Sequence, residues 1–158
     1  MKIVYLSLGS NVGDRETHLA RARERLTSDD IHILRASAIY ETEPRDFPDQ
    51  AWFLNQVVEV GTRLLPKQLL ARVQKIERAL GRLPTHPKGP RTIDIDILLY
   101  GDTILSNPGL EIPHTRLADR RFVLEPLAEL APDLRHPRTN STVKEMLAQV
   151  HHQKVQRI

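Results

Sequence analysis

The chain has 158 residues, which indicates a single domain, and a folded chain of this length buries about two thirds of the surface it exposes when unfolded. Hydrophobic residues make up 40% of the chain and charged residues 27%, a balance that is typical of globular proteins and excludes long disordered tracts. The absence of cysteine excludes zinc ribbons, iron–sulfur clusters, thiol catalysis and disulfide scaffolds.

The apolar runs and the net charge indicate the cellular compartment and the kind of binding partner. No apolar run approaches the roughly 18 residues that a membrane span needs. The opening residues, MKIVYLSLGSN, predict a first strand and not a signal peptide, because no small-residue cleavage site follows them. We therefore expect a cytoplasmic protein. The net charge of +3 fits an anionic small molecule as well as it fits nucleic acid.

The first elements in chain order are a strand, a helix and a second strand. Residues 2–8 are apolar and partly β-branched, which predicts a strand. The cluster GSNVGD at 9–14 predicts a turn, and Asp14 is placed to cap a helix with the apolar stripe Leu19, Ala22 and Leu26. Partial alternation over 31–42 predicts the next strand.

The later elements repeat this order. Residues 53–62 predict a third strand, and Pro66 then begins a helix that Gly81 ends. Three prolines in 82–91 predict an irregular loop, and TIDIDILLYG at 92–101 predicts a fourth strand. Two further helices are expected over 122–130 and from Thr142 onward.

The order strand–helix–strand–strand–helix–strand predicts the fold class. It is the order of a ferredoxin-like α+β sandwich, βαββαβ, in which helices pack on an antiparallel sheet. The C-terminal third is then an extension that covers part of the other face. We expect one domain over 1–158.

The strongest local signal is the alternation in Ile93-Asp94-Ile95-Asp96-Ile97. Strand side chains alternate between faces, so the isoleucines face one side and both aspartates the other. Carboxylates at this spacing can reach two divalent ions roughly 3.5–4 Å apart, and hard oxygen ligands favour magnesium or manganese. An exposed polar strand face explains the same pattern without any metal.

Basic residues on both sides of this strand favour a phosphate ligand. Arg82 and Arg91 enclose the loop before it, with Lys88 between them. An arginine group follows the strand beside His114 and consists of Arg116, Arg120 and Arg121. Guanidinium groups match phosphate oxygens and stabilise charge that develops in phosphoryl transfer. The pattern predicts a nucleotide polyphosphate with magnesium. The loop 82–91 is then either a lid or a plain connector.

Two phenylalanines and an asparagine are candidates for binding a flat heterocycle. Phe53 begins a strand, and Phe122 follows the arginine group. Each could lie in the core or stack on a ring. Asn55 points to the same side as Phe53 and offers both a donor and an acceptor.

Two other functions remain open from the residues alone. An Asp-x-Asp pair also occurs in other magnesium-dependent, nucleotide-using transferases, although a sugar site would be richer in polar groups. A ferredoxin-like sheet with a basic pI could instead bind nucleic acid through exposed aromatic and basic residues. The two acids of TIDIDILLYG would repel such a partner unless they bind metal.

Several segments together resemble one family. They are GSNVGD, YETEP, DQAWFLN, QKIERALGR, GPRTIDIDILLYG and IPHTRLADRRFVLEPLAELAP. In order and spacing they are similar to the 6-hydroxymethyl-7,8-dihydropterin pyrophosphokinases of folate biosynthesis. The resemblance implies a ferredoxin-like core, ATP as co-substrate, a dihydropterin acceptor and AMP as product. It also implies a monomer without nucleic-acid or membrane partners.

The resemblance also implies site residues. Two magnesium ions would bind Asp94 and Asp96, with Arg82 and Arg91 as further catalytic groups. The remaining ATP-binding positions are Gln74, Glu77, Ile97, Leu110, His114 and Arg120. The positions that match the pterin pocket, to which Asp94 also belongs, are Thr42, Pro44, Phe53, Asn55 and Phe122.

Three positions depart from the pattern of many family members. Pro84 stands where a second loop arginine is common, Lys88 where a tryptophan precedes GPR, and Thr115 where a tyrosine follows the histidine. These differences concern the closure of the loop rather than the class of reaction. We expect Lys88 or His86 to replace some of the lost charge.

Overall fold

The computed structural model describes residues 1–43, 51–81 and 92–158. The expected loop 82–91, with Arg82 and Arg91, lies outside the described residues, and so does Pro44. Thirteen elements are found in the described ranges. They are β1 (Lys2–Ser10), α1 (Arg15–Leu26), β2 (Ile31–Ala36), β3 (Tyr40–Thr42), β4 (Phe53–Thr62), α2 (Pro66–Ala79), β5 (Asp94–Tyr100), β6 (Leu105–Asn107), β7 (Leu110–Ile112), the 3₁₀ turn η1 (Leu117–Asp119), α3 (Arg121–Leu130), α4 (Val143–Ala148) and β8 (Gln156–Arg157).

The main sheet confirms the predicted ferredoxin-like order. Its strands run β5-β1-β4-β3-β8, with β2 also pairing with β4, and every pairing is antiparallel. β6 and β7 form a separate two-stranded ribbon. Among the described residues, no helix has the length and apolar character that crossing a bilayer requires.

The predicted strand over 31–42 is two strands, because Ser37 interrupts it. The Ser37 hydroxyl accepts a hydrogen bond from the Val57 amide at 3.0 Å, and the Ser37 carbonyl accepts one from the Gln56 side chain at 2.7 Å. These side-chain bonds replace part of the regular strand ladder with β4. The chain therefore leaves the ladder after β2 and rejoins it at β3.

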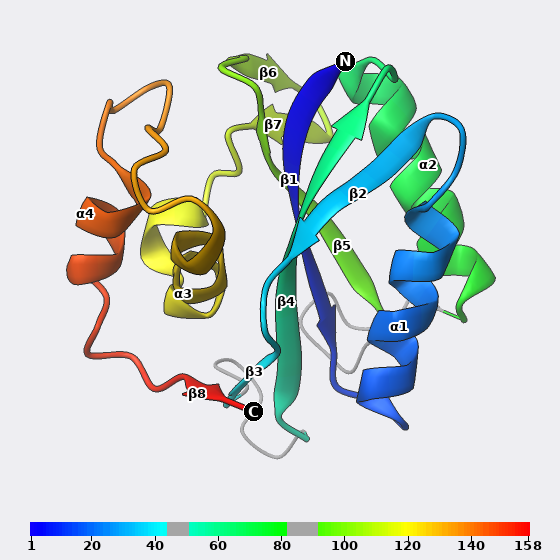
Figure 1. Ribbon diagram of the computed structural model, residues 1–158, viewed down its shortest axis with the longest axis horizontal. Helices are drawn as coiled ribbons and strands as arrows, with labels where there is room; N and C mark the ends of the chain where they lie inside the picture. The colour runs from blue at the N-terminus through cyan, green and yellow to red at the C-terminus, as the bar shows by residue number, and fades with distance from the viewer. Residues whose placement is uncertain (44–50, 82–91) are drawn as a thin grey trace.

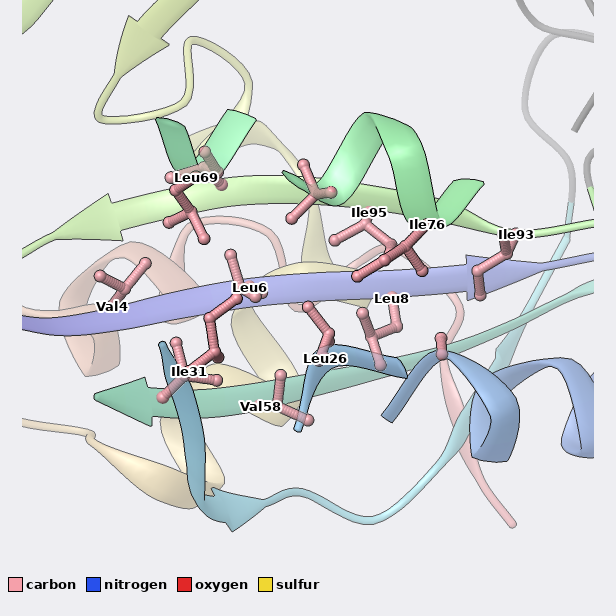
Figure 2. Packing of buried hydrophobic residues seen from close by; sticks show 14 of the residues in the cluster. Val4, Leu6, Leu8, Leu26, Ile31, Val58, Leu69, Ile76, Ile93 and Ile95 are labelled. Atoms are coloured by element: carbon pink, nitrogen blue, oxygen red, sulfur yellow. The ribbon is translucent and has the colours of Figure 1, made fainter. Parts of the chain in front are cut away.

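Helices α1 and α2 cover one face of the sheet (Figure 1). Apolar residues of both helices and of β1, β4 and β5 form the first core, part of which Figure 2 shows. Ile93, Ile95 and Ile97 are all buried in it, as the alternation in β5 predicts. Full burial of such side chains stabilises a fold by about 1.5–3 kcal/mol each.

Helices α3 and α4 cover the opposite face of the sheet (Figure 1). They enclose the second core together with Tyr5 of β1, Val57 of β4, and Leu98 and Leu99 of β5. A register shift between β1 and β5 leaves Leu98 unmatched, so two consecutive leucines face this core, as a β-bulge allows. Toward the start of β5 the same face becomes polar.

The helix boundaries agree with the capping signals in the sequence. The Asp14 carboxylate accepts a hydrogen bond from the Thr17 amide at 3.1 Å, at the start of α1. Pro66 is the first residue of α2, where its missing N–H costs nothing. The predicted turn at 9–14 begins too early, because Gly9 and Ser10 belong to β1.

Candidate active site

The strand register builds a polar patch on the sheet from Ser7, Gly9, Asn55, Asp94 and Asp96. Asp94 lies opposite Gly9, and Gly9 lies opposite Asn55 on its other side. Asp96 lies opposite Ser7. Paired residues share a face, so both carboxylates and the Asn55 amide lie on the face that also carries the second core. Both aspartates are half-buried.

Glu77 lies at the outer edge of β5, next to the backbone of the residue between the two aspartates. It is buried on α2, and its carboxylate accepts a hydrogen bond from the Ile95 amide at 2.8 Å. β5 is an edge strand, so this bond satisfies an amide at the sheet edge. Gln74 is exposed on α2, three residues earlier and therefore on the same side of the helix.

Thr42, Asn55 and Phe53 lie together at the end of the sheet. The Asn55 amide donates a hydrogen bond to the Thr42 hydroxyl at 3.0 Å, and both residues are buried. Phe53 lies opposite Thr42 in the β3–β4 pairing and is partly buried. The structure therefore brings together three of the residues assigned to the pterin pocket.

His114 lies in the same region, next to β5. Its amide donates a hydrogen bond to the Leu98 carbonyl at 3.0 Å, and its ring Nδ1 accepts one from the Arg116 amide at 3.0 Å. Burial lowers the pKa of His114 from 6.5, the positive charge of Arg120 lowers it further, and Asp94 opposes both effects. A neutral ring that accepts at Nδ1 carries its proton on Nε2, where it can donate to an anion.

The arginines that follow His114 separate in the structure. The Arg120 guanidinium lies 5.4 Å from the centroid of the Phe122 ring, a cation–π distance. Arg121 instead binds Glu125 at 2.8 Å, and Arg116 lies 3.6 Å from Asp119. Their closeness in sequence therefore does not make a three-arginine cluster.

Two assigned residues have their side chains in the first core. Ile97 and Leu110 are both buried there. The Ile95 amide points to the outer edge of β5, and backbone groups of alternate residues point the same way. The backbone of Ile97 therefore faces this edge, whereas its side chain lies in the first core.

The described residues hold no group of three or more His, Asp or Glu side chains that could bind a metal. Asp94 and Asp96 are a pair of oxygen donors. Magnesium is commonly held by one or two carboxylates together with substrate phosphates and water. The pair therefore fits metal that arrives with a polyphosphate.

Sequence reasoning missed Gly9. A Cβ atom built on it would lie 3.4 Å from the Asn55 Oδ1 and 3.8 Å from Phe53 Cδ1. Its missing side chain thus leaves room beside the Asn55 amide. The signal was present in β1, because Tyr5, Ser7 and Gly9 alternate with the buried Leu6 and Leu8.

The fold and the polar patch fit an enzyme that acts on a phosphate-bearing substrate. A family profile described as 7,8-dihydro-6-hydroxymethylpterin-pyrophosphokinase (HPPK) matches residues 5–132. A 2-amino-4-hydroxy-6-hydroxymethyldihydropteridine pyrophosphokinase of Aquifex aeolicus is 42% identical over 145 residues, which cover 92% of this chain and 90% of the relative. The chain belongs to the HPPK family.

Two longer proteins are also similar. The folic acid synthesis protein fol1 of Schizosaccharomyces pombe is 46% identical over 92% of this chain, which spans 20% of that relative. The crystal structure of wild-type HPPK-DHPS from Plasmodium falciparum superposes with a TM-score of 0.74 at 16% identity, over 94% of this chain and 43% of that chain. The second similarity supports the fold.

Family membership gives the reaction class. The family description names a hydroxymethylpterin pyrophosphokinase, and the Aquifex aeolicus relative, of which this chain covers 90%, carries the name of the same activity. The enzyme and the fold expected from the sequence are thereby confirmed.

Proposed function

We propose that the chain transfers the pyrophosphoryl group of ATP to the hydroxymethyl oxygen of 6-hydroxymethyl-7,8-dihydropterin at the polar patch. The observation that carries this proposal is the register that aligns Asp94 with Gly9 and Asn55. It puts carboxylates suited to a metal-bound polyphosphate next to an amide suited to a heterocycle. Pterin diphosphate and AMP are the products.

Asp94 and Asp96 would hold two magnesium ions that arrive with the ATP phosphates. This assignment is supported by the shared face of the two carboxylates and by their partial exposure. When bound, the ions cancel charge on the triphosphate and make its β-phosphorus accessible to attack.

The ATP-binding groups surround β5. His114 donates from Nε2 to a phosphate oxygen, and Arg120 stabilises negative charge that spreads during transfer. Gln74 and Glu77 hold the nucleotide from α2, and the backbone of Ile97 with the nearby Leu110 borders the base. Arg82 and Arg91 belong to this set by the resemblance of their motifs and lie outside the described residues.

The dihydropterin lies between Phe53 and Phe122. This position is supported by Thr42, which lies opposite Phe53 in the sheet and lines one cavity with Phe122. Thr42 and Asn55 bind its polar edge, and Pro44 completes the set outside the described residues.

The transfer is a single displacement. The pterin hydroxymethyl oxygen forms a bond to the β-phosphorus while the bond from that phosphorus to the α,β-bridging oxygen breaks, and the hydroxyl proton is released. AMP leaves with the bridging oxygen. The groups around the patch hold the two substrates in line, so positioning supplies much of the rate.

The first test is a product analysis with ATP, magnesium and the dihydropterin. Pterin-dependent AMP without ADP supports pyrophosphoryl transfer. Pterin-dependent ADP would mean single phosphoryl transfer and would contradict the proposal. No nucleotide consumption by the folded protein would contradict it as well.

The metal assignment has its own test. Asp94→Asn and Asp96→Asn are each expected to lower kcat by about 100-fold or more, because an amide is a poor magnesium ligand, with thermal unfolding nearly unchanged. Asp102→Asn, at an exposed turn after β5, is the matched control. Near-normal turnover in both site variants would refute the assignment.

We also propose that residues 1–158 form one domain and act as a cytoplasmic monomer. The sheet supports the first point, because both cores pack on it. Light scattering after size exclusion tests the second, and a stable dimer would contradict it.

A further inference from the structure

The segment that follows α4 is tied to the start of α3. The Gln153 side chain donates a hydrogen bond to the Asp119 carbonyl at 2.8 Å and accepts one from the Arg121 amide at 2.9 Å. The Arg121 guanidinium donates to the carbonyls of His151 at 2.8 Å and Gln153 at 2.6 Å. Four hydrogen bonds therefore join residues 151–153 to residues 119–121.

These bonds lie on both sides of Arg120, a residue of the proposed site. Gln153 holds the backbone directly before and directly after Arg120, and Phe122 is the next residue. The Arg120 guanidinium lies 5.4 Å from the Phe122 ring centroid. Arg121 is further fixed by Glu125, whose carboxylate accepts from it at 2.8 Å. Gln153 is thus bonded to the backbone on both sides of Arg120 and to the residue directly before Phe122.

The same segment then borders the proposed pterin site. Residues 152–155 line a cavity of about 240 Å³ together with Thr42, Glu43 and Phe122. Beyond it, β8 pairs with β3, and the Ile158 amide donates to the Ile39 carbonyl at 2.9 Å. Figure 1 shows this segment passing from α4 below α3 to β3. It is therefore held at both ends.

We propose that residues 152–155 form the outer wall of the dihydropterin site and that Gln153 is a positioning residue for Phe122 and Arg120. The inference rests on the proposed function, which assigns Thr42 and Phe122 to the pterin. It assigns a role to residues beyond the matched family region, 5–132. Gln153 touches no reacting atom and acts through the two residues it orients.

The test is a comparison of Gln153→Ala with Gln149→Ala, a matched control at an exposed position of the same segment. Dihydropterin binding is measured with magnesium and a non-hydrolysable ATP analogue. Gln153→Ala is expected to raise the Kd and the KM for dihydropterin about fivefold through Phe122 and to lower kcat about threefold through Arg120. Gln153→Glu keeps the acceptor for the Arg121 amide and is expected to restore part of the affinity.

A second variant tests the wall independently of the hydrogen bonds. Val155→Phe places a larger side chain in the cavity lining and so reduces the cavity volume, and it is expected to weaken dihydropterin binding without changing the midpoint of thermal unfolding. Unchanged pterin affinity in both Gln153→Ala and Val155→Phe would overturn this inference and leave the proposed function standing. A parent chain that forms no pterin-dependent AMP would overturn the proposed function and the inference with it.

Discussion

At the scale of single residues, the surroundings of His114 keep its imidazole neutral. Burial is the main cause of its lowered pKa, and Arg120 adds to it. His136 has a lowered pKa as well, because it is buried beside Arg138. Between the lowered folded pKa and 6.5, the ordinary histidine value, the unfolded chain binds more protons than the folded chain. Stability is therefore lost as the pH falls through this window.

This loss of stability at lower pH gives a prediction for His114→Gln, because glutamine cannot take up a proton. The midpoint of thermal unfolding of the parent is expected to fall between pH 7.5 and pH 5.5, and to fall less steeply in the variant. His136 leaves a residual slope. Carboxylates with lowered pKa values, such as Glu59, act at more acidic pH and do not interfere. Parallel curves for the two proteins would contradict the assignment.

Gly9 gives a prediction about space rather than charge. The γ carbons of Gly9→Val would extend past the 3.4 Å contact that a Cβ makes with Asn55. We expect dihydropterin affinity to fall by about tenfold or more, equivalent to about 1.4 kcal/mol. The fold should remain intact, because valine favours strands more than glycine does. Titration of Gly9→Ala and Gly9→Val checks this, and unchanged binding by the valine variant would count against it.

At the scale of elements, short helices depend on their caps. α4 has only six residues, and the Thr142 hydroxyl accepts from the Glu145 amide at 3.1 Å while the Glu145 carboxylate accepts from the Thr142 amide at 2.9 Å. Since so short a helix is unstable alone, this reciprocal pair and the packing of Val143 and Met146 hold it in place.

Thr142→Ala is therefore expected to destabilise the chain by about 1 kcal/mol, which lowers the midpoint of thermal unfolding by about 2–4 °C for a domain of this size. Thr142→Ser keeps the hydroxyl and should behave like the parent. Turnover should stay normal in both. Equal midpoints for the alanine and serine variants would show that the cap contributes nothing.

The elements also show what the sequence can and cannot predict. Period-two alternation placed Ile93–Ile97 on two faces correctly, because strand geometry is local. The break at Ser37 could not be predicted in this way, because it depends on Gln56, nineteen residues away. Arg121 was grouped with Arg120 by sequence, yet its partners include His151 and Gln153, thirty or more residues later. Local patterns predicted the helices and strands. The contacts of Ser37 and Arg121 could not be predicted, because their partners are distant in sequence.

At the scale of the whole molecule, one sheet supports two cores. Leu6 is buried in the first core and Leu124 in the second. β1 and β4 contribute to both, so loss of either core exposes apolar surface on strands that the other core needs. We expect a single cooperative unit rather than a stable core with an independent C-terminal part.

Leu6→Ala and Leu124→Ala test this expectation. Each should lower the free energy of unfolding by about 2–5 kcal/mol and shift one shared transition. Calorimetry together with circular dichroism checks that the calorimetric and van't Hoff enthalpies agree. A separate early transition in Leu124→Ala would show that α3 and α4 unfold independently.

The two-sided strand β5 has a consequence for tolerance to mutation. Between residues 93 and 97, every second side chain enters the first core and the others form part of the polar patch. In a saturation scan read by both cellular protein level and growth without added folate, isoleucine substitutions would lower abundance. Conservative aspartate substitutions would leave abundance intact and abolish growth. The two phenotypes would alternate along the strand with the spacing of its side chains.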